Sequence, residues 1–350
     1  MKLCVLGDAS YPHARNWVNY FKSRGAEVHL ISLEKSIGTL GIEHPIASKK
    51  LPGFIKYPLS INEVASLVKS INPDIVNAHF VPNYGFISAI IGTKPLVVSC
   101  FGSDVLEPPR KDILRKARIK FTLSKANLIT TDGKILKDAV HKFGIPYNRI
   151  LNVPIGINTS LFIPRKKTLP PKVVYMRRLE RVCNPELFVN ALPAILSNCN
   201  VKPIMLDMGS KRDKIFSLVK KLGLESKIEF LPFLSEQDLA NLLGESTIYV
   251  STSFSDSTSV TLLEAMSCGV FPVVTDIIGN REWIKDGVNG YLVPLNDPAQ
   301  LADKVIKSLS NSLLIEKAFL KNTDIIKKYG DRYKNMRIVE SAFLDIINKK

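Results

Sequence analysis

The sequence predicts two α/β domains, each built on a parallel sheet with helices on both faces. Three observations lead to this prediction. The 350 residues are enough for two domains of ordinary size. Short apolar segments alternate with longer segments of helical spacing along nearly the whole chain, which is typical of doubly wound parallel sheets. Hydrophobic residues make up 45% of the chain, which is sufficient for two cores.

In the first half, two segments have helical spacing and six have the short apolar pattern of buried strands. A helix is predicted near Arg15–Arg24, where Gly25 ends it, and another over Ile61–Ile71, which Pro73 follows. The strands are predicted at Leu3–Leu6, Val28–Ser32, around Ile75 and Val76, and at Pro95–Cys100, Ala126–Thr130 and Ile150–Val153.

The second half repeats the alternation. Strands are predicted at Lys172–Met176, Lys202–Met208, Ile228–Leu231, Ile248–Ser251 and Val270–Thr275. Helices are predicted at Pro185–Leu196, Asp213–Leu222, Glu236–Leu243 and Thr258–Cys268, and the tail from about Ala299 is helical and rich in lysine.

The segment from Pro164 to Pro171 is polar and rich in proline, as linkers are, and predicts the domain boundary. We therefore expect an N-terminal domain over residues 1–165 and a C-terminal domain over residues 166–330. Residues 331–350 are expected to form a C-terminal helix, for which packing back on the N-terminal domain is one option.

The formal net charge is +16, and most of it lies in the first half. Residues 1–165 hold 22 Lys and Arg against 11 Asp and Glu. Such a field attracts anions, which include nucleic acids, acidic lipids and phosphorylated substrates. No signature of a nucleic-acid-binding module occurs, so no nucleic-acid partner is expected.

The five cysteines are scattered and include no C-x-x-C pair, which argues against a disulfide framework and a zinc site. No metal site is predicted, since no histidine pair has the spacing of metal ligands either. No segment approaches the roughly 18 apolar residues of a membrane span. A cytoplasmic location is the expectation.

The stretch from Ser251 to Thr275 predicts a strand, a polar loop, a helix and a second strand. The helix is predicted over Thr258–Cys268, with Ser257 as its N-cap and Gly269 as the glycine that ends it. In open α/β sheets, ligands bind at loops that follow the carboxyl ends of strands. Free backbone N–H groups and the positive dipole end of this helix suit a phosphate.

Two carboxylates flank the start of this helix. Asp256 lies just before it and Glu264 about two turns inside it, so we expect them to contact opposite ends of an elongated ligand. Apolar neighbours place Glu264 on a largely buried helix, where a carboxylate needs a partner to offset its desolvation. A solvated Glu264 on an ordinary capped helix is the alternative.

The same stretch resembles the most diagnostic motif of glycosyltransferase family 4, a large family of retaining enzymes with the GT-B fold. The family motif is an acid, seven residues, Glu-Ala-Met, a glycine turn and a Pro-Val-Val strand. Here Asp256 and Glu264 bracket the seven residues, and Asp256 is a shortened version of the usual Glu. The remaining matches are Ala265, Met266, Gly269 and Pro272–Val274.

The resemblance extends along nearly the whole chain, and the order and spacing of the segments make it specific. The further segments that resemble the family are Pro73–His79, Gly102–Asp104, Ile155–Asn158 with Phe162, Arg178 with Leu179, and Gly287–Val293, the last resembling a family hairpin.

The resemblance implies a GT-B fold of two Rossmann-like domains facing each other across a cleft, and a metal-independent, retaining hexosyltransferase. It implies no cofactor beyond the donor, a UDP- or GDP-linked sugar held by the C-terminal domain. The donor residues are expected to be Arg178, Asp256, Glu264, Thr258, Ser259, Val260, Gly209 and Phe233. The acceptor side is expected to be formed by Gly7, Asp8, His13, His79, Gly102 and Asp104.

The resemblance also implies roles. Asp256 would touch the donor sugar, Glu264 would grip the ribose hydroxyls, and Arg178 with the helix N–H groups would stabilise charge on the departing diphosphate. No carboxylate nucleophile is evident, so a front-face reaction, in which the phosphate takes the proton of the acceptor, is the expectation.

Two positions depart from the family pattern. The usual second cation at the diphosphate, a lysine, is replaced by Cys183, and Arg177 or Arg181 are the available substitutes. The histidine often placed near the reacting carbon is replaced by Phe101. We expect His13, in the first loop, to take part of the role of that histidine.

Residues Arg110–Lys125 form a basic amphipathic segment, with Ile113, Leu114, Ala117, Phe121 and Leu123 predicted to mark one apolar side. A solvated surface helix is one interpretation. Contact with an anionic membrane surface, worth about 1 kcal/mol per basic residue, is the other. In that case the protein would be peripheral on the inner face of the membrane.

The functional hypothesis is a retaining glycosyltransferase that acts on a glycan, a lipid-linked acceptor or a small molecule. Two alternatives stay open. A nucleotide-sugar epimerase with a similar fold is one. A catalytically silent nucleotide-sugar-binding or partner subunit is the other, because the lysine and the histidine are missing.

Overall fold

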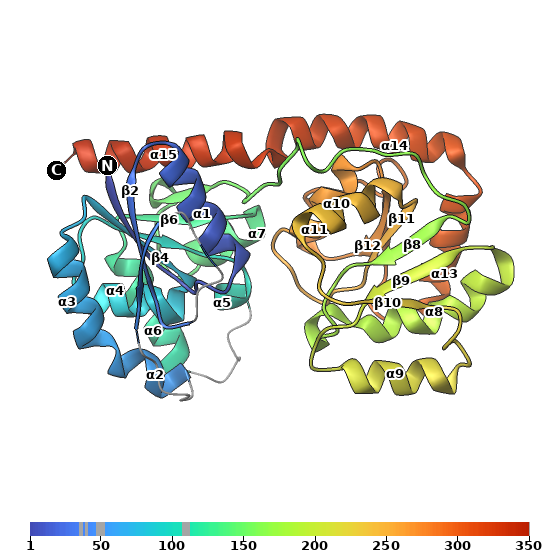
Figure 1. Cartoon of the computed structure of the whole chain (residues 1–350), viewed down its shortest axis with the longest axis horizontal. Coiled ribbons are helices and arrows are strands. Elements are labelled where there is room, and N and C mark those ends of the chain that lie inside the picture. The colour runs from blue at the N-terminus through green and yellow to red at the C-terminus, as the bar shows by residue number, and fades with distance from the viewer. Residues whose placement is uncertain (35–37, 39–40, 47–52, 107–112, 350) are drawn as a thin grey trace. The chain divides into compact units, whose positions relative to one another are not determined.

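The computed structural model describes residues 1–34, 38, 41–46, 53–106 and 113–349, and it divides the chain into two compact units (Figure 1). Unit 1 comprises Met1–Ile155 together with Tyr333–Lys350. Unit 2 comprises Gly156–Arg332. Each unit is a parallel sheet covered by helices, as the alternation of strand and helix patterns predicts.

The sheet of unit 1 has the strand order β3-β2-β1-β4-β5-β6-β7, and every pair is parallel. The order reverses between β1 and β4, and such a switch point places ligand-binding loops at the carboxyl ends of the strands. The strands are β1 (Lys2–Leu6), β2 (Glu27–Ser32), β3 (Ile42–Pro45), β4 (Ile75–His79), β5 (Leu96–Ser99), β6 (Leu128–Thr131) and β7 (Ile150–Asn152).

The helices of unit 1 cover both faces of this sheet (Figure 1). Those that precede the second unit are α1 (Pro12–Ser23), α2 (Gly53–Leu59), α3 (Ile61–Ile71), the π-helix η1 (Phe80–Gly85), α4 (Phe86–Ile90), α5 (Ser103–Leu106), α6 (Ile113–Lys125), α7 (Lys134–His141) and η2 (Tyr147–Arg149). Helix α1 begins three residues before its predicted start, because Pro12 suits the first turn of a helix.

The sheet of unit 2 has the order β10-β9-β8-β11-β12-β13 and is also parallel throughout. Its switch point lies between β8 and β11. The strands are β8 (Lys172–Tyr175), β9 (Lys202–Leu206), β10 (Glu229–Leu231), β11 (Ile248–Ser251), β12 (Phe271–Thr275) and β13 (Tyr291–Val293).

The helices of unit 2 lie close to their predicted places. They are η3 (Arg181–Cys183), α8 (Pro185–Asn198), α9 (Arg212–Lys221), α10 (Glu236–Glu245), α11 (Val260–Ser267), α12 (Ile278–Arg281), α13 (Pro298–Leu309), α14 (Ser312–Ile325) and η4 (Ile326–Gly330). Among the described residues, no helix is both long enough and apolar enough to cross a membrane.

The pattern of the sequence did not predict the edge strands β3 and β13. Strand β3 is only partly buried, so it lacks the apolar run of an interior strand. The segment that resembles a family hairpin forms no antiparallel pair. The Gly287 N–H donates to the Gly290 carbonyl at 2.9 Å, and β13 then pairs with β12 in parallel.

The segment from Pro164 to Pro171, predicted as the linker, is attached to unit 2. The Arg165 N–H donates to the Gly244 carbonyl at 3.1 Å, and the Thr168 N–H donates to the Glu245 carbonyl at 3.3 Å. The chain therefore passes between the units at Ile155–Gly156, ahead of the predicted boundary at residue 165. Proline and charge resemble a linker in sequence, but the backbone groups find partners on α10.

Lys167 joins the ends of two helices. Its ammonium donates to the Gly244 carbonyl at 3.0 Å, at the end of α10, and to the Cys268 carbonyl at 2.9 Å, just after α11. A cation is favourable at the carbonyl end of a helix. Burial lowers the pKa of Lys167 to about 8.

We expect Lys167→Met to lower the free energy of unfolding by about 2 kcal/mol, because two buried carbonyls lose a charged donor. Urea denaturation followed by circular dichroism measures the change. Lys166→Met is the matched control, since Lys166 is exposed. Equal stabilities of the two variants would show that Lys167 does not stabilise the helix ends.

The last helix, α15 (Arg332–Asn348), joins unit 1 and packs on α1 (Figure 1). The ring of Phe343 stacks on Phe21 with centroids 5.4 Å apart, and the Glu340 carboxylate accepts from the Tyr20 hydroxyl at 2.7 Å. Burial and this bond raise the pKa of Tyr20. The apolar positions of α15 thus complete the core of unit 1.

Candidate functional site

The helix that follows β11 begins later than its sequence predicts. Helix α11 starts at Val260, and Ser259 is its N-cap, with the hydroxyl oxygen accepting from the Leu262 N–H at 3.3 Å. The prediction that Ser257 caps a helix starting at Thr258 is therefore wrong. Backbone N–H groups of Val260 and Thr261 find no acceptor among the described residues.

The reason for the late start lies in the loop before α11. The ring of Trp283 donates from its nitrogen to the Thr258 hydroxyl at 3.4 Å. A Cβ on Gly279 would lie 2.4 Å from the carbonyl oxygens of Asp256 and Ser257, so α12 packs directly on this loop. These contacts hold residues 256–258 out of helical geometry.

Asp256 is held by an arginine from the end of β8. One Asp256 oxygen accepts from Arg177 Nη2 at 2.7 Å, and the other accepts from the Ser257 N–H at 2.9 Å. Arg177 Nη1 also donates to the Ser259 hydroxyl at 2.9 Å. Burial alone would lower the pKa of Arg177, but the Asp256 carboxylate outweighs it and raises that pKa further.

Arg178, the next residue along the chain, is exposed. Its side chain is 59% exposed, and its ion pair with Glu180 is long, at 3.9 Å. The Glu180 carboxylate is engaged by the N–H of Ser210 at 3.0 Å, which draws the loop after β9 toward the loop after β8. The Arg178 guanidinium can therefore reach a ligand without breaking a strong internal bond.

Gly209 allows the two loops to touch. Its φ is +146°, and an added Cβ would lie 2.4 Å from the Leu179 carbonyl oxygen. The Leu179 N–H donates to the Met208 carbonyl at 2.7 Å, which fixes this approach. Any side chain at position 209 would separate the loops.

Glu264 is buried on α11, with 5% of its surface exposed. Desolvation raises the pKa of its carboxyl to about 8, although the charge of Arg332 opposes the shift. No described residue donates a hydrogen bond to this carboxyl. A hydroxyl-bearing ligand would supply the missing partner.

Phe233 lies in the loop after β10, at the same edge of the sheet, and is 72% exposed. A bare aromatic ring at a ligand-binding edge is suited to stacking on a planar group. Arg178, Gly209, Phe233 and Asp256 thus all follow the carboxyl ends of strands of unit 2, where α11 also begins, and Glu264 lies further along α11.

Unit 1 gathers the predicted acceptor residues at the carboxyl ends of β1, β4 and β5. The ring of His79 lies 5.0 Å from Phe101, and an added Cβ on Gly7 would lie 3.4 Å from His79. His79 is buried, and burial lowers its pKa to about 3. Its nitrogen bonds to the Asn77 amide at 2.9 Å, so His79 supports the loops from beneath.

His13 lies at the surface of the same cluster. Its ring stacks on Phe101, with centroids 5.3 Å apart and planes 6° apart. The imidazole predicted to act near the reaction is therefore adjacent to the residue that replaces the family histidine. If His13 takes part of the role of that histidine, its ring has to lie this close to Phe101.

Two predicted acceptor carboxylates have internal partners. Asp104 is buried and accepts from the Val81 N–H at 3.1 Å and the Phe101 N–H at 3.2 Å. Burial raises the pKa of Asp104, while these bonds oppose the shift. Asp8 accepts from the Ser10 N–H at 2.9 Å. Asp104 thus shapes the loop that contains Gly102, whose φ is +108°.

Of the apolar side that the sequence predicts for helix α6, only Leu123 is buried. Ile113 and Leu114 are 79% and 83% exposed, and the buried residues are Ile119, Thr122 and Leu123. The buried residues of the helix therefore lie from Ile119 onward. Arg110 and Lys111, at the start of the predicted segment, lie outside the described residues.

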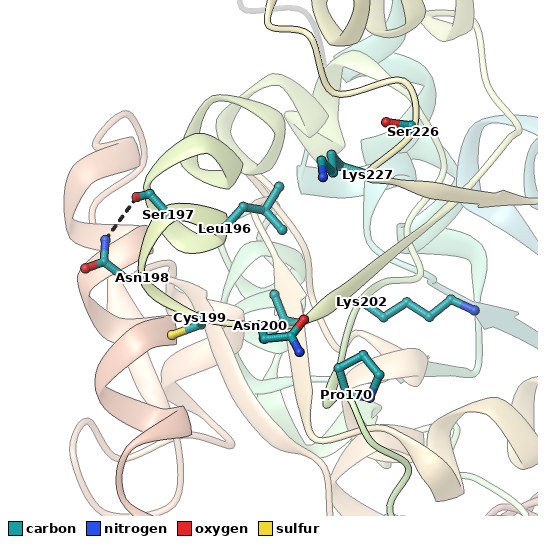
Figure 2. Close-up of a pocket in the computed structure, with 10 residues that line it drawn as sticks. Pro170, Leu196, Ser197, Asn198, Cys199, Asn200, Lys202, Ser226 and Lys227 are labelled. Carbon is teal, nitrogen blue, oxygen red and sulfur yellow. Dashed lines mark hydrogen bonds between the residues drawn. The ribbon is translucent and has the colours of Figure 1, made fainter.

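A hollow of about 530 Å³ lies elsewhere on unit 2 (Figure 2). Leu196 and Cys199 line it at the end of α8, with Pro170, Lys202 and Lys227. Lys202 begins β9, so the hollow opens at the amino ends of the strands, away from the predicted site. Within the described parts of the chain, no metal-ligand cluster is found.

Sequence reasoning overlooked Arg332 and Glu236 near Glu264. Arg332 donates to Glu236 at 3.1 Å, and both charges act on the pKa of Glu264. Neither residue belongs to a recognisable motif, and Arg332 is far from Glu264 along the chain. The ion pair of Arg177 with Asp256 was also not predicted, although Arg177 lies next to Arg178 in the sequence.

Comparison with known proteins links both halves of the chain to sugar transfer. Residues 157–328 match the family described as glycosyl transferases group 1, and residues 2–133 match the family described as glycosyl transferase 4-like.

Three individual proteins illustrate the similarity. The N-acetyl-α-D-glucosaminyl L-malate synthase of Bacillus anthracis is 24% identical, over 74% of this chain and 71% of that protein. The D-inositol 3-phosphate glycosyltransferase of Acidothermus cellulolyticus is 25% identical over 61% of this chain, which spans about half of that protein, 51%. The Anabaena HepE crystal structure with UDP has a TM-score of 0.78 at 18% identity, covering 98% and 99% of the two chains.

Proposed function

The chain belongs to the group 1, family 4-like glycosyltransferases, and we propose that it transfers a sugar from a nucleotide-sugar donor with retention of anomeric configuration and without a metal ion. The observation that supports this proposal best is the start of α11. There, two backbone N–H groups have no described acceptor, the N-cap Ser259 and Asp256 are joined by Arg177, and a buried carboxyl with no described hydrogen-bond donor lies on the same helix.

The chemistry of this edge suits a departing diphosphate. Cleavage of the bond between sugar and diphosphate develops negative charge on a phosphate oxygen, and preorganised donors stabilise that charge. Arg178 would supply a planar fork and α11 its N–H groups, while Asp256 would contact the sugar. The phosphate would then take the proton of the acceptor on the same face of the sugar.

The donor is proposed to be a UDP- or GDP-linked sugar. HepE, which shares the fold, has been crystallised with UDP and with UDP-glucose. The Glu264 carboxyl would accept hydrogen bonds from the ribose hydroxyls, and Phe233 would lie against the base. Both assignments use side chains of unit 2 for which the described residues supply neither a hydrogen-bond donor, for Glu264, nor a stacking ring, for Phe233.

The acceptor is proposed to be a glycan, a lipid-linked acceptor or a small molecule that binds unit 1 near His13 and Phe101. The excess of basic residues in the first half favours an acceptor with negative charge. Two relatives are named for L-malate and for D-inositol 3-phosphate, which both carry such charge.

A screen of nucleotides by thermal unfolding tests the donor proposal. A ligand at a hundred times its dissociation constant adds about 2.7 kcal/mol to stability, so UDP or GDP should raise the melting temperature by several degrees. Glu264→Ala, if folded, should lose the shift. A chain whose melting temperature responds to no nucleoside diphosphate or nucleotide sugar would contradict the proposal.

The screen leaves two rivals, which a turnover assay separates. A silent binding or partner subunit would bind the nucleotide but release no sugar above background. An epimerase would convert the donor sugar without an acceptor. Transfer of the sugar to an added acceptor supports the glycosyltransferase.

We also propose that α6 contacts an anionic membrane surface, which would make the protein cytoplasmic and peripheral. Exposed Ile113 and Leu114 lie on the same helix as the exposed lysines Lys120 and Lys125, and apolar anchors beside basic residues are typical of interfacial helices. This combination favours a lipid headgroup region over bulk water.

Sedimentation with liposomes tests this contact. Binding should rise with the fraction of anionic lipid and fall with salt, and Lys120→Glu/Lys125→Glu should weaken it by about tenfold or more. Ile113→Ser/Leu114→Ser should weaken it as well, without loss of stability. Equal binding to neutral vesicles would remove the proposal.

A further inference from the structure

Arg177 brings a second guanidinium to the edge of unit 2 where Arg178 lies. We propose that Arg177 binds the donor diphosphate directly, in place of the lysine that the family has where this chain has Cys183. The inference rests on the proposed function and chooses between the two substitutes, Arg177 and Arg181, that the sequence offers.

The guanidinium of Arg177 lies against the start of α11. Arg177 Nη1 donates to the hydroxyl of Ser259, at 2.9 Å, and Ser259 is the N-cap of α11. The next two backbone N–H groups, of Val260 and Thr261, are those without a described acceptor. A phosphate bound by these N–H groups would therefore lie beside Arg177.

Arg177 has a hydrogen-bond donor that no described residue uses. Its Nε is buried and has no hydrogen-bond partner in the described chain, and 19% of the side chain is exposed. A buried donor without an acceptor costs free energy, which a ligand oxygen would recover. Ser259 and Asp256 accept only from Nη1 and Nη2 of the guanidinium.

Hydrogen bonds tie positions 177 and 183 to the same loop. The Cys183 carbonyl accepts from the Thr252 hydroxyl at 2.9 Å, at the start of the loop between β11 and α11. Arg177 donates to Asp256 in that loop at 2.7 Å. Because both positions are held against this loop, a cation on Arg177 can take the place of a lysine at position 183.

The balance of charge at this edge also favours Arg177. A sugar-linked diphosphate carries negative charge on each phosphoryl group, and Asp256 adds another beside it. Arg178 and the dipole of α11, equivalent to about half a positive charge, do not balance them. Arg177 restores the balance, whereas Arg181, the first residue of η3, is exposed and has no bond to α11 among its described contacts.

Calorimetric titration with UDP tests the inference. UDP carries the diphosphate but no sugar, so a residue that only positions Asp256 for the sugar would not alter its affinity. Arg177→Met should weaken UDP binding by about tenfold to a hundredfold, the effect of a charged hydrogen bond. Arg181→Met, the matched control with the same loss of charge, should change it by less than about threefold.

Three further variants sharpen the test. Asp256→Asn should bind UDP at least as tightly as the parent chain, because a negative charge is removed. Arg177→Met/Cys183→Lys should recover most of the lost affinity. If Arg177→Met does not fold, Arg177→Met/Asp256→Asn leaves no unpaired charge, and its affinity is compared with that of Asp256→Asn.

The affinities of these variants for UDP separate the further inference from the proposed function. Equal UDP affinity of Arg177→Met and Arg181→Met, or of the double variant and Asp256→Asn, would overturn the inference while leaving the proposed function intact. If Arg177→Met/Cys183→Lys binds UDP no more tightly than Arg177→Met, the inference that Arg177 replaces a lysine at position 183 is overturned. If the parent chain binds neither UDP nor GDP, the proposed function fails first.

Discussion

Arg178→Ala is expected to lower the rate of sugar transfer by about a hundredfold or more, because the leaving diphosphate loses a preorganised donor. The variant should remain as stable as the parent chain. The Arg178 side chain is 59% exposed and its ion pair with Glu180 is 3.9 Å long. Exposed ion pairs contribute about 0–1 kcal/mol. The measurement is kcat with the donor that the nucleotide screen selects.

The control variants for Arg178 separate charge from geometry. Arg178→Lys keeps the charge but loses the planar fork, so it should recover only part of the rate. Arg181→Ala removes the same charge from an exposed neighbour and should leave kcat within a few fold. A rate for Arg178→Ala close to that of the parent chain would exclude Arg178 from the reaction.

Glu264 is expected to make the protein less stable as the pH rises. The carboxyl has a pKa of about 8 in the folded chain, against the ordinary pKa of 4.5 that it has in the unfolded chain. The folded state therefore holds this proton more tightly. Its stabilising effect is complete below the lower pKa and is lost as the pH rises through the upper one.

The expected loss for Glu264 between pH 5 and pH 8 is on the order of 3 kcal/mol in the free energy of unfolding. Urea denaturation at several pH values measures it. Glu264→Gln keeps the shape without the ionisation, so the difference between the two chains should follow this course. Parallel stability curves for the parent chain and Glu264→Gln would contradict the burial of the carboxyl.

Much of the fold could be predicted because its signals are local. Buried parallel strands need continuous apolar runs, and the helices between them need apolar residues at helical spacing, so Leu3–Leu6 and Ile61–Ile71 were recognisable from composition and order alone. The edge strand β3 (Ile42–Pro45) escaped because it is only partly buried and lacks such a run.

Local signals also misplaced some boundaries. Ser257 and Ser259 are both acceptable N-caps in sequence, and the packing of Gly279 against the loop at Asp256 selects Ser259. The polar, proline-rich segment around Lys167 resembles a linker, yet its backbone and ammonium groups bond to the ends of α10 and α11.

By itself, the sequence determined the class of the two domains, the family motif and the residue types that a phosphate site requires, because these depend on spacing along one helix or strand. Only the tertiary structure decided how those residues are used. Arg177 was one of two candidate cations until folding placed it against Asp256 and Ser259. Contacts between distant segments depend on packing and desolvation, which no local pattern records.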